Sequence, residues 1–144
     1  MSTHLVQVVQ SMYAAFGRGD VPALLAPLRA DVDWHVNVDP KAPGASAVPL
    51  FRPRHGPAEV GQFFADLAAN LEFHSFQPQS FLSGEREVAV RVLMEATVKS
   101  TGRRAQFESI HHFTFDEKGR VARFVDFLDT LADADSWNVV QAKR

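Results

Sequence analysis

The 144-residue chain contains no cysteine. Disulfides, thiolate metal sites and cysteine nucleophiles are therefore excluded together. A surplus of positive charge is also missing, because 15 Lys and Arg residues stand against 17 Asp and Glu residues, for a formal net charge of −2. Such a chain has little capacity to neutralise phosphates, so we expect no nucleic-acid partner.

Long hydrophobic runs are absent as well. No apolar stretch approaches the roughly 18 residues of a membrane-spanning helix. The N-terminal MSTHLVQVVQ lacks the basic stretch and apolar core of a secretory signal. These features predict a cytoplasmic protein with no membrane partner. Glycine-rich nucleotide fingerprints, phosphate loops and internal repeats are missing too, which excludes the activities that they support.

The remaining histidines and acids give no sign of a metal centre. The histidines at positions 4, 35, 55 and 74 fall in different predicted elements, and no pair of them has the i, i+4 spacing of a helical metal site. We therefore expect neither a metal nor a cofactor.

The composition of the chain, with 46% hydrophobic and 22% charged residues, is that of an ordinary globular protein. A chain of this length can bury roughly 70% of its unfolded surface, enough for one core with an internal cavity. We expect a single domain over residues 1–144.

Helical signals dominate the first half of the chain. Apolar residues recur at three- and four-residue steps between positions 2 and 16, with Ser2 or Thr3 available as an N-cap. The GRGD segment ends this helix, and Asp20 can cap a second, short one. A third helix over 57–71 places five large apolar side chains on one face: Val60, Phe63, Phe64, Leu67 and Leu71.

Strand signals dominate the second half. Alternating residues over 31–39 predict one strand, whose apolar face carries Trp34 and Val36. The proline-rich segment 39–56 predicts an irregular loop, either a lid over a pocket or a passive connector. Four further segments between residues 72 and 130, separated by glycine-containing turns, predict an antiparallel sheet of hairpins.

The last predicted hairpin brings polar side chains onto an apolar face. If Phe115 pairs with Arg120 across a glycine bulge, then His111 lies opposite Phe124 and diagonal to Asp126. One face then carries His111, Phe113, Phe124, Asp126 and Leu128. An aspartate in such surroundings costs free energy as an anion unless it is hydrogen-bonded or paired.

This arrangement suggests a proton-transfer site with Asp126 and His111 as its catalytic residues. A one-residue slip in register would present His112 instead of His111. Arg91 on the neighbouring strand could pair with Asp126 or hold a substrate anion. The competing interpretation is structural: Asp126 is exposed near the strand end, or ion-paired, and the histidine only packs.

The final strand also appears apolar on both faces. Phe124 and Leu128 alternate with Val121, Val125 and Phe127. Helices can cover only one of these faces, so we expect a homodimer through the other face of the sheet.

The order helix, helix, strand, long loop, helix and four strands resembles the nuclear transport factor 2-like superfamily. The segments GRGDVPALLAPLRADVDWHV and FTFDEKGRVARFVDFLDT carry the resemblance, which covers nearly the whole chain. Within the superfamily the sequence looks like the ketosteroid-isomerase-related and SnoaL-type polyketide cyclase branch. The resemblance implies an α+β fold, in which a cone-shaped curved antiparallel sheet and three N-terminal helices wrap around a hydrophobic pocket, usually in a dimer.

The resemblance also implies a chemistry. SnoaL-type cyclases use an Asp on the final strand with a His on the preceding one, a pattern that Asp126 fits together with His111 or His112. Ketosteroid isomerases have an Asp base, a Tyr and a protonated Asp at the positions that look like Val36, Met12 and His111, and all three differ here.

Limonene-epoxide hydrolases offer a second comparison. Asp126 matches their final-strand Asp and Arg91 can match their Arg. Leu93 stands where their middle Asp belongs, and Val36 replaces an Asn. Glu95 is the only nearby carboxylate that could substitute for the missing one.

The sequence therefore predicts a small-molecule-binding protein, in the first place a cofactor-independent acid–base enzyme of the isomerase or aldol-cyclase type acting on an apolar carbonyl compound. The alternatives are a non-catalytic ligand-binding or dimeric scaffold protein, and an epoxide-hydrolase-like enzyme. We expect the pocket to be lined by Met12, Trp34, Val36, Phe63, Arg91, Leu93, Phe113, Phe124 and Leu128.

Overall fold

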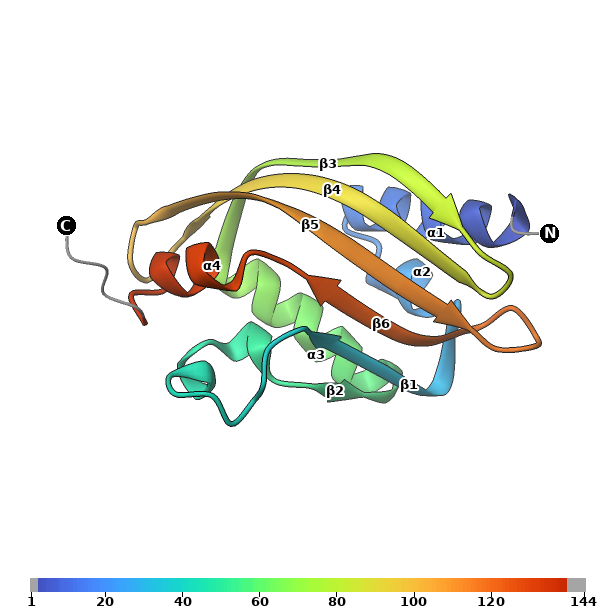
Figure 1. The fold of residues 1–144 in the computed structure, drawn as a ribbon, viewed down its shortest axis with the longest axis horizontal. Helices are drawn as coiled ribbons and strands as arrows, with labels where there is room; N and C mark the ends of the chain where they lie inside the picture. Colours follow the sequence, from blue (N-terminus) through green and yellow to red (C-terminus); the bar gives the residue numbers. More distant parts are fainter. Residues whose placement is uncertain (1–2, 140–144) are drawn as a thin grey trace.

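The computed structural model describes residues 3–139 and contains one six-stranded sheet with four α-helices (Figure 1). The helices are α1 (Thr3–Gly17), α2 (Val21–Leu25), α3 (Gly56–Asn70) and α4 (Thr130–Ser136). The strands are β1 (Leu28–Val36), β2 (Arg54–His55), β3 (Leu71–Ser83), β4 (Glu87–Val98), β5 (Arg104–Phe115) and β6 (Val121–Phe127).

The N-terminal helices form where the sequence predicts them. Leu5, Val9 and Met12 on one face of α1 are buried in the core. The Asp20 side chain caps α2 by accepting from the backbone N–H of Ala23 at 3.1 Å. The predicted cap Ser2 lies outside the described residues. None of the helices within residues 3–139 is long and apolar enough to cross a membrane.

The sheet has the strand order β2-β1-β6-β5-β4-β3. Strands β3 to β6 pair antiparallel with their chain neighbours, as predicted. Strand β1 differs, because it runs parallel to β6. A parallel pair needs a long connection, which most of the chain supplies here. Register shifts within β3 accompany the curvature by which the sheet arches over the helices in Figure 1.

The proline-rich segment 39–56 is more regular than predicted. It contains two short 3₁₀ helices, Ala45–Ala47 and Pro49–Phe51, and then strand β2, which pairs with β1. Its apolar side chains are buried in a second cluster beside the main core. Arg54, only 1% exposed, donates to the Asp66 carboxylate and to the Pro49 carbonyl at 2.9 and 2.8 Å. The segment is thus a packed wall of the fold.

The last hairpin is shifted by two residues from the predicted register. Phe115 pairs with Val121 beyond a bulge, and His111 lies directly opposite Asp126. An even shift keeps every side chain on its predicted face, so the pocket face is unchanged. The bulge, however, turns Val121 into the core.

The predicted outward row of Val121, Val125 and Phe127 is therefore wrong in part. Val121 and Val125 are buried within the single chain. Phe127 remains 44% exposed, and its partner across the strands, Ile110, is 38% exposed. The apolar surface on this face is smaller than the sequence suggests.

Residues Thr130–Ser136 form helix α4. Asp129 caps it by accepting from the backbone N–H of Ala132 at 3.0 Å. The β4–β5 turn holds its other end, because Thr101 donates to the Ser136 carbonyl at 2.6 Å and Arg103 to that of Asp135 at 2.9 Å. Figure 1 places α4 beneath the curved ends of β4 and β5.

Candidate functional site

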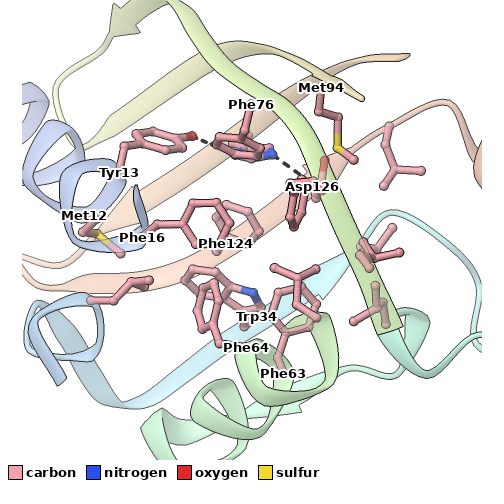
Figure 2. Close-up of a pocket in the computed structure, with 18 of the residues that line it drawn as sticks. Met12, Tyr13, Phe16, Trp34, Phe63, Phe64, Phe76, Met94, Phe124 and Asp126 are labelled. Atoms are coloured by element: carbon pink, nitrogen blue, oxygen red, sulfur yellow. Dashed lines mark hydrogen bonds and ion pairs between the residues drawn. The ribbon is translucent and has the colours of Figure 1, made fainter. Parts of the chain in front are cut away.

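A cavity lies between the concave face of the sheet and the helices (Figure 2). The cavity has a volume of about 100 Å³. Its size suits a small ligand. Its walls are aromatic and aliphatic apart from five residues with polar groups: Tyr13, Trp34, His111, Asp126 and Asp133.

The aromatic walls are fixed by mutual packing. Trp34 on β1 stacks on Phe124 of β6 with ring centroids 3.9 Å apart and planes inclined by 19°. The His111 ring meets Phe124 edge to face at 5.2 Å. These contacts hold the polar side chains of the cavity in defined orientations.

Three polar side chains from three elements form a connected series. The Tyr13 hydroxyl from α1 lies 2.7 Å from His111 Nδ1 on β5. His111 Nε2 lies 3.6 Å from Asp126 Oδ2 on β6, an ion-pair distance rather than a hydrogen bond. Figure 2 shows the two contacts in line along one wall. The predicted pair His111 and Asp126 is therefore brought together.

Burial decides where the protons of this series sit. Burial, followed by the charge of Asp126, raises the pKa of Tyr13 well above its usual value. The phenol keeps its proton, so its O–H is available to donate to His111 Nδ1. A neutral imidazole that accepts at Nδ1 carries its proton on Nε2. In that tautomer the N–H of His111 faces the Asp126 carboxylate.

Helix α4 contributes a second carboxyl group to the cavity. Asp133 is 9% exposed and lines the cavity wall. Burial, followed by the charge of Asp126, raises the pKa of Asp133 to about 7. Below that pH the Asp133 carboxyl is neutral and can donate a hydrogen bond, whereas an ionised carboxylate can only accept.

Seven of the nine predicted lining residues line the cavity: Met12, Trp34, Val36, Phe63, Phe113, Phe124 and Leu128. The other two, Arg91 and Leu93, are corrections. Val90, Val92 and Met94 take the inner face of β4, so the strand's alternation turns both residues outward.

Three of the side chains that point to the outer face of the sheet have ion-pair partners there. Arg91 pairs with Glu108 at 3.0 Å on this surface, and therefore not with Asp126. Glu95 pairs with Arg104 at 2.7 Å, which removes it as a pocket carboxylate. His112 also points outward and lies 2.8 Å from Glu87. The structure thus selects His111 over His112 for the cavity.

Two polar residues of the site were not predicted. Tyr13 lies beside Met12 on α1, and its partner His111 is 98 residues away in the chain. Asp133 sits in a short acidic stretch that resembles a solvent-exposed terminus. The helical period of α4, with Asp133 and Ser136 buried on one side, is the only signal that could have revealed it.

Within residues 3–139 no three His, Asp or Glu side chains come close enough together to suggest a metal site. The polar groups of the cavity can instead exchange protons. The arrangement can accept a proton at Asp126, relay charge through His111, and donate hydrogen bonds from neutral groups.

Comparisons with known proteins agree with this fold. An NTF2-like protein of unknown function from Burkholderia pseudomallei is similar at 28% identity with a TM-score of 0.80, over 97% of this chain and 99% of that one. An NTF2-like protein from Burkholderia xenovorans is similar at 27% identity and 0.80, over 93% and 95%. A protein named as a putative polyketide cyclase, from Xanthomonas campestris, shares the fold at 16% identity with a TM-score of 0.71, over 92% of this chain and 96% of that one.

The comparison with curated proteins found no match. The family model of the SnoaL-like domain matches residues 9–124, which include the second half of α1 and the strands that carry His111 and Trp34. Four-fifths of the chain is thereby covered, and the NTF2-like architecture extends over the described remainder. The chain belongs to the SnoaL-like domain family and has the NTF2-like fold.

Proposed function

We propose that the protein is a cofactor-independent acid–base enzyme, of the isomerase or aldol-cyclase type, that acts on a small apolar carbonyl compound. One observation carries the proposal: the series Tyr13, His111, Asp126 ends in a carboxylate on the wall of an otherwise apolar cavity. A side chain so placed can transfer protons to and from a bound ligand, an effect worth roughly 10² to 10⁴ in rate.

The roles follow from the surroundings of the two carboxylate oxygens of Asp126. The Oδ1 atom of Asp126 is buried and has no hydrogen-bond partner within the described residues, whereas Oδ2 faces His111. Oδ1 is therefore the atom that takes a proton from the carbon next to a carbonyl group. The C–H bond breaks, its electron pair moves onto the carbonyl oxygen, and the proton rests on Asp126.

The product depends on where the proton or the carbon goes next. In an isomerisation Asp126 returns the proton to a different carbon. In an aldol closure the enolate carbon attacks a second carbonyl, whose oxygen then takes the proton. The neutral Asp133 carboxyl supports either course, because a hydrogen-bond donor stabilises the enolate oxygen in a water-poor cavity.

Epoxide hydrolysis is a second candidate because the cavity holds two carboxyl groups. One carboxylate would orient a water molecule and a neutral acid would protonate the epoxide oxygen. Asp126 and Asp133 supply this combination. The second carboxylate was expected near Leu93, at Glu95, but Glu95 pairs with Arg104 instead. A purely ligand-binding protein is the third reading.

The test is deuterium exchange at C2 of 1-tetralone in D₂O, followed by proton NMR with wild-type protein and Asp126→Asn. We expect the wild type to accelerate exchange and Asp126→Asn to lose a factor of about 10² or more at an unchanged melting temperature. Glu108→Gln on the outer face is the matched control and should exchange as the wild type does.

Two results would contradict the proposal. An Asp126→Asn protein that is destabilised but fully active per folded molecule would make Asp126 structural. A wild type that binds 1-tetralone, accelerates no exchange and opens no styrene oxide would identify a ligand-binding protein.

A further inference from the structure

Two buried polar atoms on the cavity wall have no partner within the described residues: Trp34 Nε1 and Asp126 Oδ1. Trp34 is only 4% exposed. Buried polar groups in folded proteins are nearly always hydrogen-bonded, so each exception calls for an explanation. The two atoms are opposite in kind, since the indole N–H can only donate and the carboxylate oxygen accepts.

Ring packing prevents the indole from rotating toward another hydrogen-bond acceptor. It stacks on Phe124 at 3.9 Å, and Phe64 and Phe63 meet it at inclined angles at 5.7 and 6.2 Å. Figure 2 shows the indole nitrogen at the edge of the ring nearer to Asp126. The packing of these rings therefore holds the donor in this orientation.

The strand pairing fixes how far apart the two atoms are anchored. Strands β1 and β6 are parallel neighbours, with Trp34 opposite Phe124 and Val36 opposite Asp126. Trp34 and Asp126 are thus on adjacent strands, two residues apart and on one face. Strand spacing and rise place their backbones roughly 8 Å from each other.

We propose that Trp34 is a ligand-binding and specificity-determining residue whose indole N–H donates to an acceptor oxygen of the ligand, while Asp126 meets a donor group at the other end. The ligand is then a neutral, compact hydroxy-carbonyl compound. Its body is apolar because the walls are apolar, and it is small because the cavity is small.

The charges around the cavity favour a neutral ligand. The described lining contains the carboxyl groups of Asp126 and Asp133 but neither Lys nor Arg. A ligand carboxylate would find no Lys or Arg partner there, and the imidazole of His111 already faces Asp126. This inference rests on the proposed function only in taking the cavity as the ligand site.

The experiment is a binding cycle by calorimetry with four related probes. Tetralin has no polar group, 1-tetralone only an acceptor, 5,6,7,8-tetrahydro-2-naphthol only a donor, and 6-hydroxy-1-tetralone both. We expect the wild type to bind 6-hydroxy-1-tetralone about tenfold or more tightly than the naphthol. In Trp34→Phe the gain in affinity that the carbonyl group provides should disappear. The affinity for the naphthol should change less than twofold.

A second variant guards against loss of packing in Trp34→Phe. Benzothienylalanine at position 34 keeps the bicyclic shape but lacks the N–H, and it should reproduce the loss. Asp126→Asn provides the reciprocal test. It should reduce the gain in affinity that the hydroxyl group provides and leave the gain from the carbonyl group unchanged.

The outcomes separate this inference from the proposed function. If the carbonyl advantage survives in both position-34 variants, or if all four probes weaken equally, Trp34 only packs. If none of the four probes binds, the ligand class is wrong. Deuterium exchange catalysed by the wild type but unaffected at Asp126→Asn would instead overturn the proposed function and leave the role of Trp34 to the binding cycle.

Discussion

At the scale of single residues, burial determines what each polar group of the cavity can do. Tyr13 stays protonated because its phenol is buried near a carboxylate. Its O–H can donate to Nδ1 of His111, and the tautomer that accepts there points an N–H at Asp126. A single hydrogen bond at one end of the series thus controls the group at the other end.

Tyr13→Phe tests this control. The variant should lose about 1 kcal/mol of stability, the usual net value of one hydrogen bond, and about tenfold in turnover. The diagnostic measurement is the ¹⁵N NMR spectrum of the His111 imidazole. It should change from the Nε2–H tautomer to a mixture of tautomers.

A packing variant provides the control for Tyr13→Phe. Phe76→Leu also removes ring contacts with Tyr13 and His111 but leaves the hydroxyl in place. It should lower stability without altering the tautomer. An unchanged imidazole spectrum in Tyr13→Phe would show that the hydroxyl does not position His111.

Asp133 makes stability depend on pH. Its pKa in the folded protein is about 7, against 3.8 for an unperturbed Asp. Between these values the native state keeps a proton that the unfolded chain has lost, so stability falls as pH rises. The contribution of this group should decline by on the order of 4 kcal/mol between pH 4 and pH 7.

Asp133→Asn removes the titrating group and should flatten this part of the pH profile in urea unfolding. The exposed Asp31→Asn serves as the control and should leave the slope as it is in the wild type. A slope that persists in Asp133→Asn would assign the pH dependence to other groups.

At the scale of elements, the segment between β1 and α3 depends on one buried cation. Arg54 joins this segment to α3 through Asp66, and its guanidinium lies over the Phe63 ring at 5.5 Å. Leu50 from the same segment lines the cavity. The ion pair therefore holds one wall of the site in place.

Asp66→Asn should destabilise the protein by about 2 kcal/mol, because it leaves a buried guanidinium without its counter-charge. Denaturant unfolding measures the loss. Arg52→Ala is the matched control: Arg52 contacts the same carboxylate at 3.9 Å but is exposed, so its loss should cost less than about 0.5 kcal/mol. Equal losses in the two variants would refute a special role for Arg54.

Elements also show what a sequence can predict. His111 and Asp126 were found because alternation fixes the face of a strand, and a register error of two residues preserves it. Val121 was misplaced because no residue pattern indicates the bulge between the Thr114–Arg123 and Phe115–Val121 pairs. Tyr13 and Asp133 were missed because their roles depend on contacts between α1, α4 and distant strands, which no local period encodes.

At the scale of the whole molecule, the outer face of the sheet remains to be accounted for. Ile110 and Phe127 lie opposite each other there, partly exposed, beside the Arg91–Glu108 pair. We propose that a second copy of the chain packs on this face. The patch is smaller than the sequence suggested, yet it is apolar at its centre and charged at its rim, as protein interfaces are.

Sedimentation tests the dimer. The wild type should sediment as a dimer at micromolar concentration, and Phe127→Asp should yield a monomer of about 16.0 kDa. Leu82→Asp, at an exposed leucine at the far end of β3, is the control and should remain dimeric. A monomeric wild type would exclude the dimer.

The parallel contact between β1 and β6 has a consequence for the order of folding. The cavity wall joins Trp34 to Phe124, and Tyr13 to His111 across 98 residues, so its contacts are among the most distant in the chain. Contacts that close such long loops form late and slow the search for the native state. During synthesis α1 and β1 emerge first, and their apolar faces stay uncovered until β6 has been made. A ligand can therefore act only on the finished protein: it slows unfolding and does little to guide the nascent chain.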